Sequence, residues 1–119
     1  MPRGDEARVQ AAFEQWLANS GWTLRFKAER GDVDVDAVHA DGRRLLAEVK
    51  GRTSAPGLDV DTAYGQLLRR MTGEMNTAYA VVVPESCVAA ALRVPQAVRD
   101  LLDITVYAVN EQGDVRFVA

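Results

Sequence analysis

Apolar residues recur along the chain with the two spacings that distinguish helices from strands. In the first twenty residues they follow one another at intervals of three and four, which predicts a helix over residues 5–19. Asp5 supplies a capping carboxylate at its start, and Gly21 suits the left-handed residue after its last turn. Apolar and polar residues then alternate, which predicts strands over residues 22–29, 33–39 and 44–50.

The second half of the chain continues with helices and strands. Residues 51–58 predict a loop, and a helix follows from about Asp59 to Met71. Residues 77–83 are almost entirely apolar, as in a strand covered on both faces. The remaining pattern predicts helices over 86–93 and 95–102 and closing strands over 104–109 and 115–118. This order predicts a single α/β domain over residues 1–119, with a mixed central sheet and helices on its faces.

Composition and charge narrow the class of protein. The 119 residues carry a net charge of −3, so nucleic acid could be attracted only by a local basic patch. The single cysteine, Cys87, excludes an intrachain disulfide and is typical of a reducing compartment. No apolar run has the length of a signal peptide core or a transmembrane helix. We therefore expect a cytoplasmic protein without a membrane partner.

A row of acidic residues on neighbouring strands is not explained by packing in a hydrophobic core. Asp32, Asp34 and Asp36 share one face of their strand, and Glu48 and Lys50 share one face of the next. A two-residue turn at Asp41-Gly42 would place Glu48 opposite Val35, on the wrong face. A three-residue loop, or a bulge beside Gly42, brings the acidic faces together. A functional site here therefore requires an irregular turn.

Carboxylates that meet in this way repel one another unless a cation lies between them. Lys50 offsets one negative charge, and a divalent metal ion offsets more. A site that offers only oxygen ligands favours Mg²⁺ or Mn²⁺ over Zn²⁺. The alternative is that the acidic row is a solvated strand face that discourages edge pairing.

An aspartate, a short turn and then Glu48-Val49-Lys50 at the end of the next strand resemble the PD-(D/E)XK nuclease superfamily, which includes restriction endonucleases and Holliday-junction resolvases. Its common core is α-β-β-β-α-β, the order predicted above for residues 5–84. The resemblance implies a restriction-endonuclease-like αβββαβ core, followed here by C-terminal helices and two closing strands. The proline of the motif's name is absent from this chain.

The resemblance also implies a metal-dependent nuclease that hydrolyses nucleic acid, most simply DNA. Asp36, Glu48 and the Val49 carbonyl would hold Mg²⁺ or Mn²⁺, and Lys50 would position the attacking water. Asp34 is either an additional metal ligand or the main ligand in place of Asp36.

Further residues are candidates for the same site. Some branches of the superfamily carry a glutamate on the first helix, where Glu6 fits better than Glu14. Others carry a glutamine on the helix after the motif, at the place of Gln66, which faces either a substrate groove or only water. A basic rim for nucleic acid is expected from Arg43, Arg44, Arg52, Arg69 and Arg70.

A second class of function remains open. A domain of the same fold could bind nucleic acid, or act as a scaffold, without cutting. The chain contains no recognisable helix-turn-helix, so a domain this small would need a homodimer or a larger complex to select a substrate. We interpret Trp16 and Trp22 as core anchors and not as stacking platforms for bases.

Overall fold

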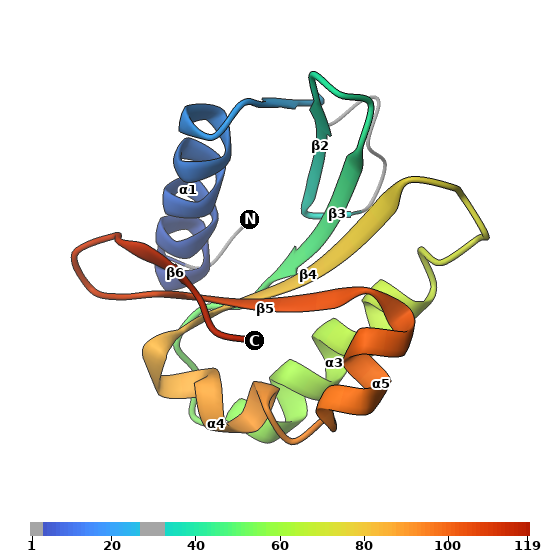
Figure 1. The fold of residues 1–119 in the computed structure, drawn as a ribbon. Helices are drawn as coiled ribbons and strands as arrows, with labels where there is room; N and C mark the ends of the chain where they lie inside the picture. The colour runs from blue at the N-terminus through green and yellow to red at the C-terminus, as the bar shows by residue number, and fades with distance from the viewer. Residues whose placement is uncertain (1–3, 27–32) are drawn as a thin grey trace.

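The computed structural model describes residues 4–26 and 33–119, which form a curled sheet with helices on both faces (Figure 1). The helices are α1 (Gly4–Asn19), α3 (Pro56–Leu68), α4 (Val88–Ala91) and α5 (Gln96–Leu102), with a 3₁₀ turn over Glu85–Cys87. The strands are β1 (Trp22–Leu24), β2 (Val35–His39), β3 (Arg44–Val49), β4 (Thr77–Pro84), β5 (Ile104–Val109) and β6 (Val115–Phe117). The predicted α/β class and the order of its elements are confirmed.

The strands lie in the sheet in the order in which they follow along the chain. β1, β2 and β3 pair antiparallel, β3, β4 and β5 pair parallel, and β6 returns antiparallel to β5. The carboxyl ends of β3, β4 and β5 therefore meet at one edge of the sheet, the edge at which ligands bind in many α/β proteins.

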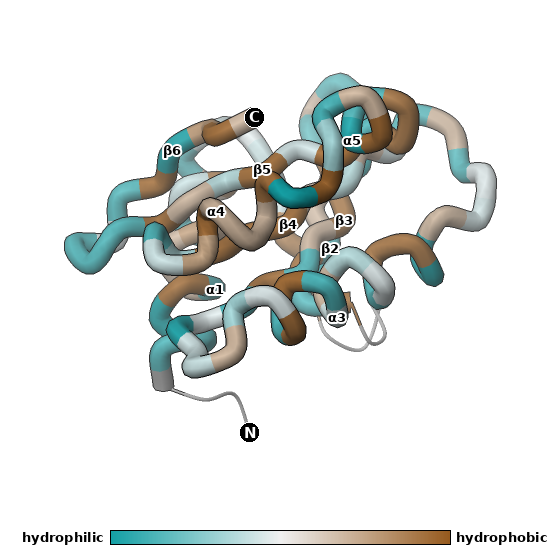
Figure 2. Tube along the Cα trace, turned by 90° about the horizontal axis from the view of Figure 1, so that it is seen from below, coloured by the Kyte–Doolittle hydropathy of each residue, from teal (hydrophilic) through white to brown (hydrophobic). Residues whose placement is uncertain are grey.

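Two hydrophobic clusters hold the layers together. Phe13 and Leu17 of α1 pack with Val35, Ala47 and Val82 on one face of the sheet. The other cluster joins α3 and α4 to the opposite face, around residues such as Leu46, Val60, Leu67, Val81 and the buried Cys87. Figure 2 shows hydrophobic segments running through the centre of the molecule and hydrophilic segments in the outer turns. Each fully buried aliphatic or aromatic side chain contributes about 1.5–3 kcal/mol to this packing.

The turn between β2 and β3 has the odd length that the sequence required. Val38 pairs with Arg44, and the His39 amide donates to the Arg43 carbonyl, so three residues form the loop. Gly42 closes the loop with a φ of 93°, which a glycine adopts without a steric penalty. The register predicted for a functional site is thereby confirmed.

Three boundaries differ from the pattern-based expectation by three residues or more. The strand predicted over 22–29 ends at Leu24, and residues 27–32, including the acidic Asp32, lie outside the described residues. The helix predicted from Asp59 begins earlier, at Pro56, because a proline in the first turn lacks only an N–H that would have no intrahelical partner. It ends earlier too, at Leu68, where the Arg70 amide donates to Leu67 in a tighter turn.

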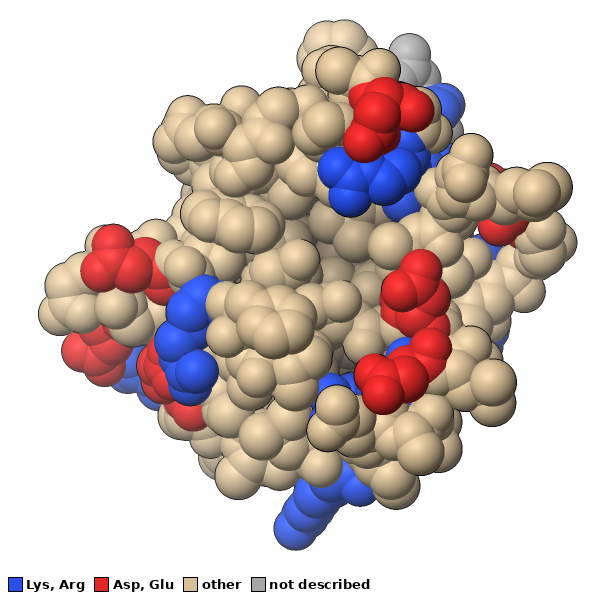
Figure 3. Space-filling view, in the orientation of Figure 1, with Lys and Arg blue, Asp and Glu red and all other residues tan. Residues whose placement is uncertain are grey.

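Acidic and basic side chains are interspersed on the face seen in Figure 3, without a broad field of one sign. No helix in the described part of the chain combines the length and hydropathy needed to span a bilayer.

Candidate functional site

The three-residue turn sets which acid faces Glu48. Val35 pairs with Ala47 and Asp36 pairs with Leu46, so the chain just before β2, which carries Asp34, reaches the end of β3. The Asp34 and Glu48 carboxyl groups are close enough there to interact. Within the paired strands, Asp36 and Glu48 lie on the same face as Leu46, which is the α3 side of the sheet. Asp34, and not Asp36, is therefore the direct neighbour of Glu48.

The backbone of β3 holds the Asp34 carboxylate in place. The backbone amide of Val49, at the end of β3, donates to Asp34 Oδ2, just before β2, at 2.9 Å. Gln10 of α1 donates to the Asp34 backbone carbonyl at 3.0 Å. These two contacts fix Asp34 beside the end of β3.

Glu48 is a carboxyl group in a buried position, with only 2% of its surface exposed. Burial, together with the neighbouring Asp34 carboxylate, raises the pKa of Glu48 to about 8. The Arg70 guanidinium, whose Nη2 lies 3.5 Å from Glu48 Oε1, acts in the opposite direction. In the absence of another cation, this environment favours the protonated form of Glu48.

Asp36 has a different environment. Arg44 donates to both of its carboxylate oxygens, at 3.1 and 2.8 Å, and Arg25 Nε lies 3.6 Å from Oδ2. Arg44 also pairs with Glu74, so the buried Asp36 belongs to a partly exposed ion-pair network that joins β2, β3 and the segment before β4. The structure does not test metal binding, and the assignment of Asp36 as a ligand stays a prediction, but the geometry favours Asp34.

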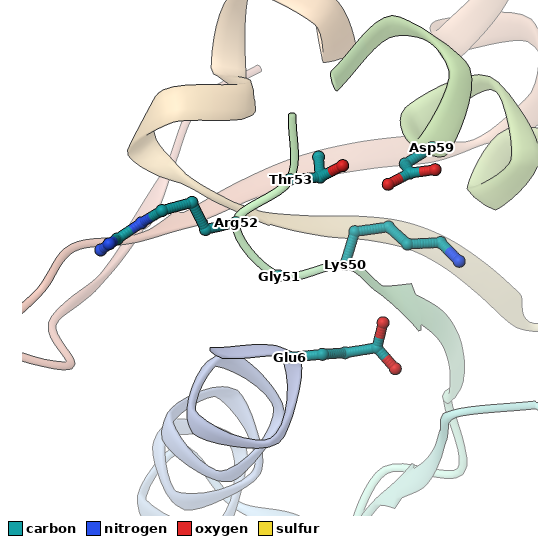
Figure 4. A pocket seen from close by; sticks show the side chains of 6 residues that line it. All are labelled: Glu6, Lys50, Gly51, Arg52, Thr53 and Asp59. Carbon is teal, nitrogen blue, oxygen red and sulfur yellow. The ribbon is translucent and has the colours of Figure 1, made fainter. Parts of the chain in front are cut away.

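Lys50 lies at the mouth of a cavity of about 160 Å³ between the N-termini of α1 and α3. Figure 4 shows that the side chains of Glu6 and Lys50 extend in the same direction, with Asp59 of α3 on the opposite side of Lys50 from Glu6, whereas Arg52 points away from them. Lys50 and Glu48 are two residues apart at the end of β3, and their backbone is fixed by the Lys50 amide, which donates to Val82. Within the described residues, the Lys50 ammonium forms no ion pair, so it is available to a ligand.

Gly51 allows α1 to approach the end of β3 closely. A Cβ atom added at Gly51 would lie 2.3 Å from the Glu6 backbone nitrogen, which is far inside van der Waals contact. Glycine at this position therefore brings the first turn of α1, with Glu6, to the cavity that Lys50 lines.

The remaining predicted residues are distributed around this centre. Arg70 reaches Glu48, and Gln66, half-buried, lies one helical turn before it on α3. Arg52 lines the Lys50 cavity but pairs with Glu111 at 3.0 Å, and Arg69 is exposed. Their roles in catalysis and nucleic-acid binding stay predictions.

The donor set suits a hard cation that keeps part of its water shell. Asp34, Glu48 and the Val49 carbonyl offer only oxygen, and Mg²⁺ is commonly bound by one or two carboxylates together with water and substrate phosphates. A site closed entirely by protein side chains is not available in the described part of the chain, which contains no group of three or more metal-binding side chains. The residues therefore fit Mg²⁺ or Mn²⁺ with open positions.

Two contacts were missed by sequence reasoning. Arg44 was placed on a basic rim, yet it neutralises Asp36, and Arg70 was placed there too, yet it neutralises Glu48. The Arg44 contact could have been anticipated from the three-residue turn, which brings Arg44 and Asp36 onto the same face of adjacent strands two positions apart. The Arg70 contact depends on how α3 packs, which no local pattern specifies.

No family model matches the sequence, and no significant match is found among curated proteins. Two solved structures share the fold over almost the whole chain. One is an XisH family protein from Nostoc punctiforme PCC 73102, with a TM-score of 0.61 and 20% identity, covering 94% of this chain and 99% of that one. The other is a FdxN element excision controlling factor protein from Anabaena variabilis, with a TM-score of 0.64 and 18% identity, covering 95% of this chain and 99% of that one. At these identities the likeness establishes a common fold.

Proposed function

We propose that this protein is a metal-dependent nuclease that hydrolyses phosphodiester bonds in nucleic acid. The observation that carries the proposal is the Asp34–Glu48 pair, two adjacent carboxyl groups at the end of β3 with the unpaired Lys50 ammonium two residues further on. A purely structural pair of acids would raise the free energy of the folded state. A bound cation would offset the repulsion between the two carboxylates, so the pair is explained by a cation-binding site.

In this proposal Asp34, Glu48 and the Val49 carbonyl hold Mg²⁺ or Mn²⁺. When bound, the metal ion offsets negative charge that builds up on the phosphate in the transition state. Lys50 donates a hydrogen bond to the attacking water and stabilises its developing negative charge. The water oxygen bonds to phosphorus as the bond to the leaving oxygen breaks; the water releases a proton to solvent, and the leaving oxygen takes one up.

The test is a cleavage assay with Mg²⁺ or Mn²⁺ on duplex, branched and single-stranded substrates, combined with Mn²⁺ titration by calorimetry. The fold shared with an excision controlling factor directs the first assays to DNA. Glu48→Gln should lose both Mn²⁺ binding and cleavage. Lys50→Ala should keep Mn²⁺ binding and cut roughly 10²-fold more slowly, as for the loss of one strong electrostatic stabiliser.

A second candidate is a nucleic-acid-binding domain that does not cut. It is favoured by the Arg70–Glu48 contact, since an internal guanidinium already partly neutralises the position that a metal ion would occupy. If the parent protein binds DNA but neither binds Mn²⁺ nor cuts any substrate, this function replaces the nuclease. If it binds Mn²⁺ and Glu48→Gln abolishes that binding, the metal site stands whichever substrate is cut.

A further inference from the structure

A larger cavity, of about 430 Å³, opens at the opposite end of the sheet from Lys50. It lies between the C-terminal part of α1, the start of β3 and the starts of β4 and β5, and this face of the molecule is hollowed near its centre in Figure 3. Its walls are Trp16, Leu17, Trp22, Arg43, Leu45, Asn76, Thr77, Ala78, Asp103, Thr105 and Tyr107. Its volume is in the range of small-molecule binding sites.

Three aromatic rings form part of the lining. The ring centroids of Trp16 and Tyr107 are 5.2 Å apart, and the Arg43 guanidinium lies over the Trp22 ring, 5.4 Å from its centroid. Trp16 and Trp22 pack against the core cluster on the α1 side, as the sequence indicated, and both remain partly exposed at this cavity. They are also the only two tryptophans of the chain.

Two polar residues at the rim, Asn76 and Asp103, have a left-handed backbone conformation. Asn76 and Asp103 have φ values of 57° and 58°, and they are the only non-glycine residues with positive φ among those described. They directly precede β4 and β5, two adjacent parallel strands. In the described part of the chain, neither side chain forms a hydrogen bond or an ion pair. Their amide and carboxylate groups are therefore available to a ligand.

The rim limits the class of ligand. Arg43 covers one face of Trp22 and pairs with Asp41 at 2.8 Å. A purely apolar ligand would strip water from Asn76, Asp103 and Arg43 without replacing its hydrogen bonds. A flat ring with polar edges matches both the aromatic walls and the polar rim.

We propose that this cavity binds a nucleobase, with its ring against the indoles and its N–H edge toward Asp103. A carboxylate accepts hydrogen bonds only, and its two oxygens can receive two N–H groups side by side. Guanine offers such a pair through its ring N–H and its amino group, so guanine is the preferred base. Arg43 at the rim can contact the phosphate attached to the base.

The site is separate from the proposed nuclease centre. Leu45 lines this cavity and Lys50 lines the other, and five strand residues correspond to roughly 17 Å. Binding here needs neither a metal ion nor cleavage. The base could belong to a free nucleotide or to a nucleic-acid strand, and the experiment distinguishes the two sources.

The test uses intrinsic tryptophan fluorescence, because both indoles of the chain line the cavity. The protein is titrated with GMP, with IMP, which lacks only the amino group, and with ribose 5-phosphate, which lacks the base. A single-stranded oligonucleotide containing guanine and one without guanine form the second arm. We expect a saturable change with GMP or with the guanine oligonucleotide, weaker binding of IMP, and no change with ribose 5-phosphate.

Two variants connect the signal to the cavity. Asp103→Asn keeps a residue that tolerates positive φ but replaces one acceptor by a donor, so guanine affinity should fall roughly 10-fold while folding is retained. Trp22→Leu should weaken binding by a similar factor through loss of a stacking surface. Glu48→Gln should leave this binding unchanged, which separates it from the nuclease centre. The proposal is overturned if ribose 5-phosphate acts as strongly as GMP, if Asp103→Asn has no effect, or if no base-containing probe binds.

Discussion

Glu48 is a residue whose burial and neighbouring Asp34 disfavour its negative charge. Its carboxyl group is 2% exposed, lies beside Asp34, and receives one guanidinium contact from the described residues, at 3.5 Å. A carboxylate in this setting is stabilised by taking up a proton or by binding a cation. A carboxyl group that holds a proton in the free protein and exchanges it for a metal ion suits a metal-dependent site.

The raised pKa of Glu48 predicts a stability that depends on pH. Its pKa rises from the ordinary 4.5 to about 8 in the folded state, so the folded protein binds the proton more tightly than the unfolded chain. Stability is therefore highest below about pH 4.5 as far as this group is concerned, and it falls as pH rises toward 8. Glu48→Gln should remove that fall, making the variant more stable than the parent by a few kcal/mol at pH 9.

Urea unfolding of the metal-free proteins at pH 5, 7 and 9 measures this difference. The matched control is Glu111→Gln, since Glu111 is exposed and its ion pair with Arg52 contributes little to stability. Parallel pH profiles for Glu48→Gln and the parent would contradict the assigned pKa shift.

The two neighbouring aspartates should separate into a site residue and a structural residue. Asp36→Asn removes the buried carboxylate that Arg44 contacts, while Arg44 stays partly exposed and keeps its pair with Glu74. The substitution should therefore cost about 1–3 kcal/mol of unfolding free energy. Asp34→Asn keeps an oxygen that accepts from the Val49 amide and removes a negative charge beside Glu48, so folding should change little.

For Mn²⁺ binding, measured by calorimetry, we expect the two variants to rank in the opposite order to their losses of stability. Asp34→Asn should weaken Mn²⁺ binding more than Asp36→Asn does, with the latter measured at a temperature where it remains folded. If Asp36→Asn abolishes Mn²⁺ binding and leaves stability unchanged, Asp36 is the metal ligand and the Arg44 contact is incidental.

At the scale of elements, the sequence predicted the strands and the turn between them, but not which of Asp34 and Asp36 lies beside Glu48. The alternation of residues 33–39 and 44–50, with Asp41-Gly42 between them, predicted both strands and a turn of odd length, because only that length brings the acidic faces together. Periodicity assigns a side chain to a face of the sheet. It does not say that Arg44 pairs with Asp36, or that packing of α3 brings Arg70 to Glu48.

The junction between α1 and β3 provides a prediction about glycine. Gly51→Ala would bring a methyl group against the Glu6 backbone and push the first turn of α1 away from the site, so it should destabilise the fold by about 1–3 kcal/mol. Gly65→Ala, inside α3 with open space around it, should instead stabilise by about 1 kcal/mol. Thermal unfolding of both variants tests the pair, and equal melting temperatures would mean that α1 does not depend on this close approach.

At the scale of the whole molecule, most of the described positive charge is neutralised internally. Ion pairs with carboxylates engage seven arginines: Arg8, Arg25, Arg43, Arg44, Arg52, Arg70 and Arg116. The net charge of the chain is −3. Long-range attraction to a polyanion is therefore weak, and affinity must come from a few local contacts or from a partner that adds cations.

This charge distribution predicts a shallow salt dependence of DNA binding. In the described residues near the proposed site, Lys50 and Arg69 form no ion pair, and each phosphate contact adds about 0.9 to the slope of log affinity against log salt for duplex DNA. The isolated protein should therefore show a slope near −2, and Arg69→Ala should reduce its magnitude by about one. Arg116→Ala, which breaks a surface pair with Glu85, is the control and should leave the slope unchanged. Fluorescence anisotropy over a range of salt concentrations measures all three proteins. A slope of −5 or steeper would mean that the paired arginines exchange their carboxylates for phosphates on binding, and that the ion pairs of the free protein hold a latent nucleic-acid surface.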